Sequence, residues 1–230
     1  MPLVLRQFEC VPVADVGVLM RVDQAISEAA EHTVQAADRA ILAAELPGVT
    51  ETIPSYTSLF IGYDAAITDY ASICAQLDLL ELDDAHAIPV APHYDVPICY
   101  DGPHDNDLAV LANSLGMSRD AIINIHLSGD YHVSLYGFAP GYAYMRGVPT
   151  SIQLPRKPTP VSGVPAGSVI IAGPQCLVTT LTMPAGWWRV GFSPFRFLRG
   201  QSADPFPIPV GSSIRFRRVS LHELDTLDHA

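Results

Sequence analysis

His126 and Tyr131 stand five residues apart, where a predicted helix ends and a predicted strand begins. A histidine gains or loses a proton near neutral pH, so His126 is a candidate general acid or base, with Tyr131 beside it. The same histidine can instead cap its helix and hydrogen-bond to a neighbouring strand, and the sequence leaves both interpretations open. His93 and His104 lie in proline-rich loops without the spacing of metal ligands, so no metal site is predicted.

An aromatic turn follows the strand that begins at Tyr131. The segment "YHVSLYGFAPGYAYMRG" alternates like a strand and then meets Pro140 and Gly141, while the aromatic residues Phe138 and Tyr144 continue through the break. Glycine gives the backbone room and proline fixes its path, so we expect the two rings to project from a rigid turn as one wall of a pocket. The alternative is a barrel corner whose aromatic side chains fill the core.

A second stiff loop, "LPRKPTPVSGVPAGS", holds four prolines together with Arg156, Lys157, Thr159 and Ser168. Basic groups and hydroxyls on a rigid loop suit a carboxylate or phosphate, and arginine offers a two-pronged fork. The alternative is a solvated turn with incidental charge. Most arginines of the chain lie in its last hundred residues, so any anionic substrate is expected to bind the C-terminal half.

Composition excludes several classes of protein. The net charge of −11, with only 13 Lys and Arg, argues against nucleic acid as a partner. The four cysteines form no CxxC pair, so neither a zinc site nor a disulfide framework is predicted. No apolar run approaches the roughly 20 residues that span a bilayer, and the first residues do not read as a signal peptide. We therefore expect a cytoplasmic protein with no membrane partner.

The first ninety residues predict a small α+β domain. Period-two and helical patterns give strand, helix, strand, strand, helix, strand, at residues 16–22, 23–46, 50–56, 58–64, 68–80 and 86–92. Asp23 is the expected N-cap of the first helix. This order is the split βαβ arrangement of a ferredoxin-like sandwich, which predicts an N-terminal domain at residues 1–92.

The rest of the chain, residues 93–230, predicts a β-barrel domain. Two short helices are expected first, at 107–115 and from a Ser118 N-cap to Leu127. Short apolar runs between proline and glycine turns then indicate a closed or nearly closed all-β unit. The acidic segment after Ser220 is expected to be a loosely held terminus.

Four segments of this half resemble one protein family: "HLSGDYHVSLYGFAPGYAYM", "LPRKPTPVSGVPAGSVIIAG", "AGWWRVGFSP" and "VGSSIRF". They are similar to subunit 1 of allophanate hydrolase and of biotin-dependent carboxyltransferases, a family that includes the B subunit of 5-oxoprolinase and a sporulation-kinase inhibitor. The N-terminal "PGVTETIPSYTSLFIGYD" resembles the same family's first domain. The resemblance implies a cyclophilin-like barrel after the α+β domain, and a partner chain, subunit 2.

The resemblance also implies site residues. Gln175 and Trp187 take family positions, as do His126 and Tyr131. With the turn and the loop, this predicts His126, Tyr131 and Arg156 as catalytic residues. Substrate-binding residues are then expected at Phe138, Pro140, Gly141, Tyr144, Thr159, Ser168, Gln175 and Trp187.

The chain departs from the family pattern at several places. The family commonly has Arg where this chain has Thr57, Val161 and Phe192, Glu where it has Pro103, and Thr-Gly where it has Cys176 and Leu177. A lost arginine removes a potential anion contact worth about 1.5 to 3 kcal/mol when buried against a charged ligand. These departures leave the usual substrate open.

Three functions follow from the resemblance. The first is a subunit of an ATP-dependent hydrolase acting on a cyclic or urea-like amide, most simply 5-oxoprolinase. No Walker-type or GxGxxG motif occurs, so an ATP site would have another design or lie largely on a partner. The second is a carboxyltransferase subunit that uses biotin on a separate carrier. The third is a non-enzymatic binding protein of the kinase-inhibitor type.

Overall fold

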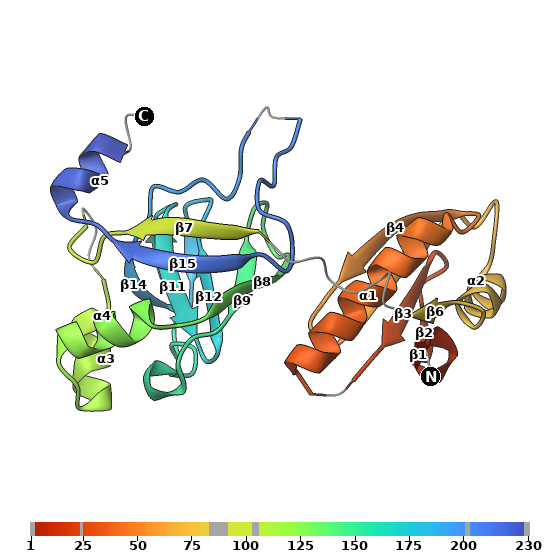
Figure 1. Cartoon of the computed structure of the whole chain (residues 1–230), viewed down its shortest axis with the longest axis horizontal. Helices are drawn as coiled ribbons and strands as arrows, with labels where there is room; N and C mark the ends of the chain where they lie inside the picture. Colours follow the sequence, from red (N-terminus) through yellow and green to blue (C-terminus); the bar gives the residue numbers. More distant parts are fainter. Residues whose placement is uncertain (1–2, 24, 83–91, 103–105, 201–202, 228–230) are drawn as a thin grey trace. The chain divides into compact units, whose positions relative to one another are not determined.

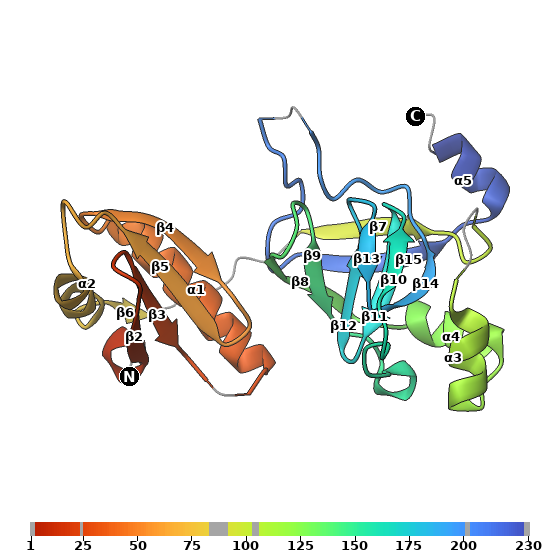
Figure 2. The same cartoon turned by 180° about the vertical axis from the view of Figure 1, so that it is seen from behind.

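The computed structural model describes residues 3–23, 25–82, 92–102, 106–200 and 203–227. These residues belong to two compact units, Met1–Val90 and Ala91–Ala230. Figures 1 and 2 together label their α-helices and strands. A domain boundary at residue 92 stays a prediction. Among the helices of the described ranges, none has the length and apolarity needed to cross a bilayer.

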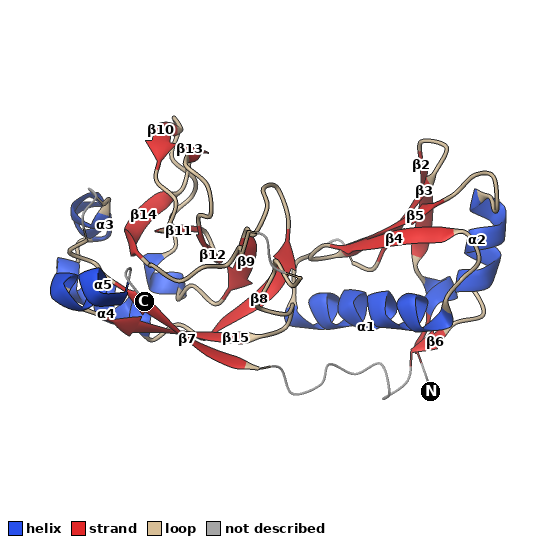
Figure 3. Cartoon of the chain, turned by 90° about the horizontal axis from the view of Figure 1, so that it is seen from above, coloured by secondary structure: helices blue, strands red, loops and turns tan. Residues whose placement is uncertain are grey.

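The N-terminal unit is an antiparallel sheet with helices packed on one face. The sheet has the order β2-β3-β5-β4, and β1 pairs separately with β6. Figures 2 and 3 show α1 along one side of the sheet. The elements are β1 (Leu3–Val4), η1 (Leu5–Gln7), β2 (Glu9–Val13), β3 (Gly17–Arg21), α1 (Glu28–Ala44), β4 (Val49–Pro54), β5 (Ser58–Tyr63), α2 (Tyr70–Leu77) and β6 (Glu81–Leu82).

Alternation in the strands decides which side chains meet these helices. Val18 and Met20 of β3 and Ile61 of β5 are fully buried and form one core with Val34 of α1 and Ile73 of α2. The residues between them, such as Leu19, lie on the other face of the sheet, because successive side chains of a strand point to opposite sides.

The ferredoxin-like order of this unit is not confirmed. The strands β4 and β5 and the helix α2 lie close to their predicted ranges. The edge of the sheet next to β3, however, is occupied by β2, which forms a hairpin with β3. The expected last strand, at 86–92, falls almost wholly outside the described residues. The predicted N-cap of α1 was also wrong: Ser27 Oγ accepts from the Ala30 N–H, whereas Asp23 accepts locally from Ala25 and closes a turn.

The C-terminal unit is built on a seven-stranded mixed sheet of order β14-β11-β12-β9-β8-β15-β7. Neighbouring strands are antiparallel except β15 and β7, which run parallel and lie side by side in Figure 1. Its strands are β7 (His93–Ile98), β8 (Tyr131–Tyr136), β9 (Ala143–Arg146), β11 (Ser168–Ala172), β12 (Gln175–Val178), β14 (Trp188–Phe192) and β15 (Ser213–Arg218). A separate ribbon pairs β10 (Val161–Val164) with β13 (Met183–Ala185), and η3 (Thr150–Ile152) follows β9.

One bridge joins the two edges of this sheet. Cys99, just after β7, exchanges two backbone hydrogen bonds with Phe192 at the end of β14, with N···O distances of 2.8 and 2.9 Å. The sheet therefore forms a nearly closed barrel, as predicted. Its interior is filled by apolar side chains, including Val96, Val133, Ile171 and Val190.

The unit is not all-β. The two predicted short helices are confirmed as α3 (Leu108–Leu115) and α4 (Arg119–Leu127), with Ser118 capping α4.

The prediction of a loosely held terminus after Ser220 was wrong, because the helix α5 (Leu221–Leu227) follows β15. The backbone N–H of Ser220 donates to Glu223, and that of Glu223 donates to Ser220 Oγ. Leu224 packs against Cys99 in a small apolar cluster, which holds the helix in place.

Gly191 is required where the barrel closes. A Cβ at this position would lie 2.9 Å from the Cys99 carbonyl oxygen and 3.0 Å from Ile98 Cδ1. We predict that Gly191→Ala lowers the free energy of unfolding of the barrel by about 1 to 3 kcal/mol, the usual cost of overpacking. Urea denaturation followed by the emission of Trp187 and Trp188 measures it.

The matched control is Gly200→Ala, because a Cβ there meets no atom of the described residues within 4 Å. An unfolding midpoint for Gly191→Ala equal to that of the control would show that the closure tolerates a side chain.

Candidate functional site

The barrel wall has an apolar surface on each side. Ala143 and Met145 of β9 and Cys176 and Val178 of β12 point into the barrel core. The alternate residues on these strands point outward, where Leu177 joins a second cluster with Tyr142, Ile170, Ala172 and Trp187. The same strands therefore build both the core and an outer apolar floor.

A concavity of about 230 Å³ lies on this outer floor. We call it the aromatic groove. Its lining residues are Phe138, Tyr142, Tyr144, Arg156, Lys157, Pro160, Ile170, Leu177, Pro184, Ala185, Gly186 and Trp187. The aromatic turn and the basic loop, which are separate in sequence, thus meet at one site.

Aromatic rings form the walls of the groove. The rings of Tyr144 and Trp187 meet edge to face, with centroids 5.8 Å apart. The ring of Phe138 lies 6.1 Å from that of Tyr142. Such arrangements are favourable beyond the area they bury, so the walls have a defined geometry.

The turn that carries Phe138 is strained and anchored. Phe138 adopts φ 69°, a left-handed conformation that is unusual for a bulky residue, and 81% of its surface is exposed. Gly141 also has positive φ, and a Cβ on it would lie 2.6 Å from Leu198 Cβ. The Thr180 hydroxyl donates to the Pro140 carbonyl, which ties the turn to the barrel. An exposed ring held in a costly conformation indicates a functional position.

The basic loop contributes two cations of different character. Lys157 Nζ lies 2.7 Å from Asp107 Oδ2, and both side chains are largely buried, so the charge of Lys157 is compensated. Arg156 lies over the Trp187 ring, with Cζ 5.7 Å from the centroid. Within the described ranges, no carboxylate forms an ion pair with Arg156. Arg156 therefore gives the groove its uncompensated positive charge.

Two phenols stand near this charge. Burial raises the pKa of Tyr144, and the neighbouring Arg156 partly opposes the rise. Burial, together with Tyr144, raises the pKa of Tyr142 as well. Both groups are therefore neutral hydrogen-bond donors near pH 7. The Tyr142 hydroxyl is buried and has no hydrogen-bond partner in the described part of the chain.

The ionisable side chains that line the groove in the described ranges are Arg156, Lys157, Tyr142 and Tyr144, and none of them is a free base, because Lys157 is paired with Asp107 and both phenols are neutral. Among the described residues that line it, none is Asp, Glu, His, Cys, Ser or Thr. A general base must reach the proton that it removes, and a nucleophile must be activated by a neighbouring base. The groove can bind and orient a ligand, but activation of water there needs a group from elsewhere.

His126 and Tyr131 do not line the groove. His126 is fully buried among core side chains, and its Nδ1 lies 2.8 Å from the Tyr100 hydroxyl. The Tyr131 hydroxyl donates to the His126 backbone carbonyl at 2.9 Å. Both residues point into the barrel, so the structure does not bring them together with Phe138 and Arg156 at the groove.

Among the described residues that line the groove, none is one of the remaining predicted residues, Pro140, Gly141, Thr159, Ser168 and Gln175. Thr159 is exposed on the loop beside Pro160. Gln175 is paired with Arg146 across β12 and β9, one step along the outer face. Ser168 is fully buried at the start of β11, where its backbone N–H donates to Thr179 Oγ1. Sequence reasoning missed Tyr142 and Leu177 as lining residues, although Tyr142 stands within the aromatic turn.

The departures from the family pattern lie in different places. Leu177 forms part of the groove floor, and Val161 is exposed on β10. Phe192 closes the barrel and borders a smaller hollow of about 190 Å³ with Gly167 and Thr179. Thr57 lies in the N-terminal unit, and Pro103 lies outside the described residues.

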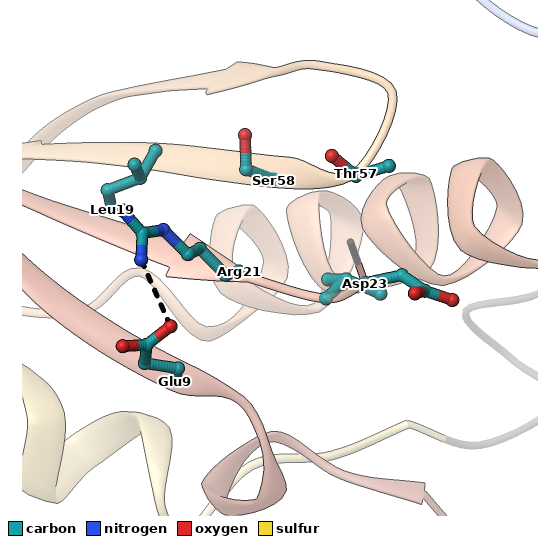
Figure 4. A pocket seen from close by; sticks show the side chains of 7 residues that line it. Glu9, Leu19, Arg21, Asp23, Thr57 and Ser58 are labelled. Carbon is teal, nitrogen blue, oxygen red and sulfur yellow. Dashed lines mark hydrogen bonds and ion pairs between the residues drawn. The ribbon is translucent and has the colours of Figure 1, made fainter. Parts of the chain in front are cut away.

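A larger and shallower hollow of about 760 Å³ occurs in the N-terminal unit (Figure 4). It is lined by Glu9, Leu19, Arg21, Val22, Asp23, Thr57 and Ser58. Arg21 Nη1 lies 3.2 Å from Glu9 Oε2, and both side chains are more than half exposed. An exposed pair of this kind contributes little energy. The hollow lacks the enclosing aromatic walls of the groove, so we regard the groove as the better candidate site.

The comparisons with known proteins agree with this architecture. Residues 8–208 match the family model described as "Carboxyltransferase domain, subdomain C and D". The chain is 31% identical over 225 residues to the B subunit of 5-oxoprolinase from Bacillus subtilis (strain 168), over 93% of this chain and 94% of that protein. It is 27% identical over 219 residues to the B subunit of 5-oxoprolinase from Escherichia coli O157:H7, over 92% and 96%.

Solved structures give the same result. The crystal structure of TTHA0988 matches with a TM-score of 0.78 at 30% identity, over 88% of this chain and 39% of that chain. This chain thus spans well under half of that structure's length. Urea amidolyase of K. lactis matches with a TM-score of 0.73 at 12% identity, over 95% of this chain and 15% of that chain, a likeness that shows the fold alone.

The nearly closed barrel and the smaller unit have a fold that also occurs in urea amidolyase and urea carboxylase of Kluyveromyces lactis. The chain belongs to the carboxyltransferase-domain family of subdomains C and D, and two B subunits of 5-oxoprolinase are similar to it over most of their length. The family predicted from the sequence motifs is therefore confirmed.

The burial of His126 predicts how stability depends on pH. Burial lowers its pKa from 6.5 to about 3, so below pH 6.5 the unfolded chain binds a proton there that the folded chain does not. Its contribution to stability is complete above pH 6.5 and is lost as the pH falls toward 3. We predict a loss of about 2 kcal/mol between pH 7 and pH 5.

Urea denaturation of the barrel at several pH values measures this loss. His126→Asn should flatten the dependence between pH 7 and pH 5, whereas His132→Asn, which changes a partly exposed histidine, should retain it. An unchanged slope in His126→Asn would contradict the assignment.

Proposed function

We propose that this chain is one subunit of a hetero-oligomeric, ATP-dependent amide hydrolase of the 5-oxoprolinase type. The observation that carries the proposal is the 31% identity to a protein named as a 5-oxoprolinase subunit, over nearly the full length of both chains. A protein named as one subunit implies others, and we propose that one of them is the related subunit 2.

The aromatic groove supports a role in substrate binding within such a complex. It combines apolar walls with a few polar groups, as small-molecule sites do. At about 230 Å³ it is smaller than the roughly 300–1,000 Å³ of pockets for drug-sized ligands, so a nucleotide would bind elsewhere. Because the described lining of the groove lacks a general base, the groups that activate water would come from another subunit. Catalysis would then depend on positioning and electrostatics across the complex.

A second function is favoured by the family model. A carboxyltransferase subunit would move a carboxyl group between biotin on a separate carrier and a small urea-like or amide substrate. The match to the carboxyltransferase domain and the fold shared with urea amidolyase support this alternative. The two functions differ in what they consume: the hydrolase uses ATP without a biotinylated carrier, whereas the transferase requires one.

The test is reconstitution. We predict that the chain co-purifies with its partner subunits, and that the complex hydrolyses 5-oxoproline when ATP is present, whereas the chain alone does not. Coupled assays of ADP and glutamate release measure the turnover. Full activity of the isolated chain would contradict the proposed division between subunits. Turnover that requires bicarbonate and a biotinylated protein would select the carboxyltransferase instead.

A further inference from the structure

The charge in the aromatic groove identifies the sign of its ligand. The chain as a whole has a net charge of −11, yet no Asp or Glu of the described ranges lines the groove. Lys157 is neutralised by Asp107, whereas Arg156 forms no ion pair within the same ranges. A single uncompensated guanidinium matches a single anionic group, and its two parallel donors match the two oxygens of a carboxylate.

The apolar surfaces identify the body of the ligand. Ile170 and Leu177 form a floor with the Trp187 ring beside it, and all three side chains are buried in one cluster. The groove volume of about 230 Å³ admits only a compact group. A small ring or short branched chain would cover this floor and exclude water from the charge contact.

A buried, unpartnered donor gives an independent indication. Only 3% of Tyr142 is exposed, the residue lines the groove, and its hydroxyl has no hydrogen-bond partner in the described residues. A buried polar group without a partner is costly. An oxygen of the ligand would supply the missing acceptor.

We propose that the aromatic groove binds a small organic carboxylate. Arg156 pairs with the carboxylate, Ile170 and Leu177 hold its apolar body against Trp187, and Tyr142 donates to an acceptor on the ligand. The proposal deepens the proposed function, since 5-oxoproline is one such carboxylate. It assigns recognition of the carboxylate substrate to this chain, with Tyr142 selecting ligands that carry a hydrogen-bond acceptor.

The experiment is a titration of the full chain monitored by the emission of Trp187, in a Trp188→Phe background that leaves one reporter. The probes are 5-oxoproline, cyclopentanecarboxylate and 2-pyrrolidinone, which separate the carboxylate from the lactam. Both carboxylates should give saturable changes, and 2-pyrrolidinone should bind at least about tenfold more weakly, because it lacks the charge-assisted contact.

Variants test the named residues. Arg156→Ala should weaken both carboxylates about tenfold or more and leave 2-pyrrolidinone unchanged. The matched control Arg215→Ala, which removes an exposed arginine of β15 outside the groove, should bind like the parent. Tyr142→Phe should weaken 5-oxoproline about three- to tenfold without lowering Tm, because it removes a hydroxyl that has no partner among the described residues.

Three results would overturn the proposal: no saturable change with either carboxylate up to roughly 10 mM, equal binding of 2-pyrrolidinone, or unchanged carboxylate affinity in Arg156→Ala.

The test also separates the groove proposal from the proposed hydrolase function. A complex that hydrolyses 5-oxoproline with the same KM after Arg156→Ala refutes the groove assignment alone. Carboxylate binding by the chain, with no hydrolysis by the complex, refutes the hydrolase alone.

Discussion

The alternation of side chains across the barrel wall is the constraint on which the site depends. β9 and β12 place Met145 and Cys176 in the core and Tyr144 and Leu177 on the outer floor. Each strand therefore stabilises the barrel with one set of residues and shapes the groove with the other. A shift of one residue in register would exchange the two sets. The bridge between Cys99 and Phe192 closes the sheet, and the pairing of Cys176 with Met145 sets the register of β12 and β9.

Much of the chemistry-bearing surface could be predicted from sequence because it is local. A glycine-proline turn and a proline-rich basic loop are readable patterns, and the structure brings Phe138 and Arg156 from them to one groove. The face of the wall on which each side chain lies was not readable. β8 and β9 pair with a shift in register between Val133 and Leu135, so the alternation that begins at Tyr131 cannot be continued to Tyr144. The resemblance put His126 and Tyr131 among the site residues, whereas in the structure both are buried in the barrel core.

Strand pairing explains the other differences. The parallel pairing of β7 with β15 joins the two ends of the C-terminal unit and leaves no local pattern. The hairpin of β2 with β3 takes the sheet edge that a split βαβ order gives to its last strand; it is local, but no strand was predicted at Glu9–Val13. The C-terminal helix did leave one, since Ser220 and Glu223 have the spacing of a capping box, but the acidic composition of the segment favoured a loose tail. A groove whose described lining offers Arg156, two phenols and a lysine paired with Asp107 is consistent with a chain that recognises a substrate while other subunits supply the chemistry.

The most direct test of ligand binding in the aromatic groove is a methyl NMR titration of the chain with 5-oxoproline, which compares the signals of Ile170 with those of its neighbour Ile171. Ile170 lies on the groove floor, and Ile171 points into the core on the other side of the same strand. We expect saturable shifts of the Ile170 and Leu177 methyl signals, with Ile171 and Val178 nearly unchanged. Shifts confined to the core methyls, or none at either set, would contradict binding in the aromatic groove.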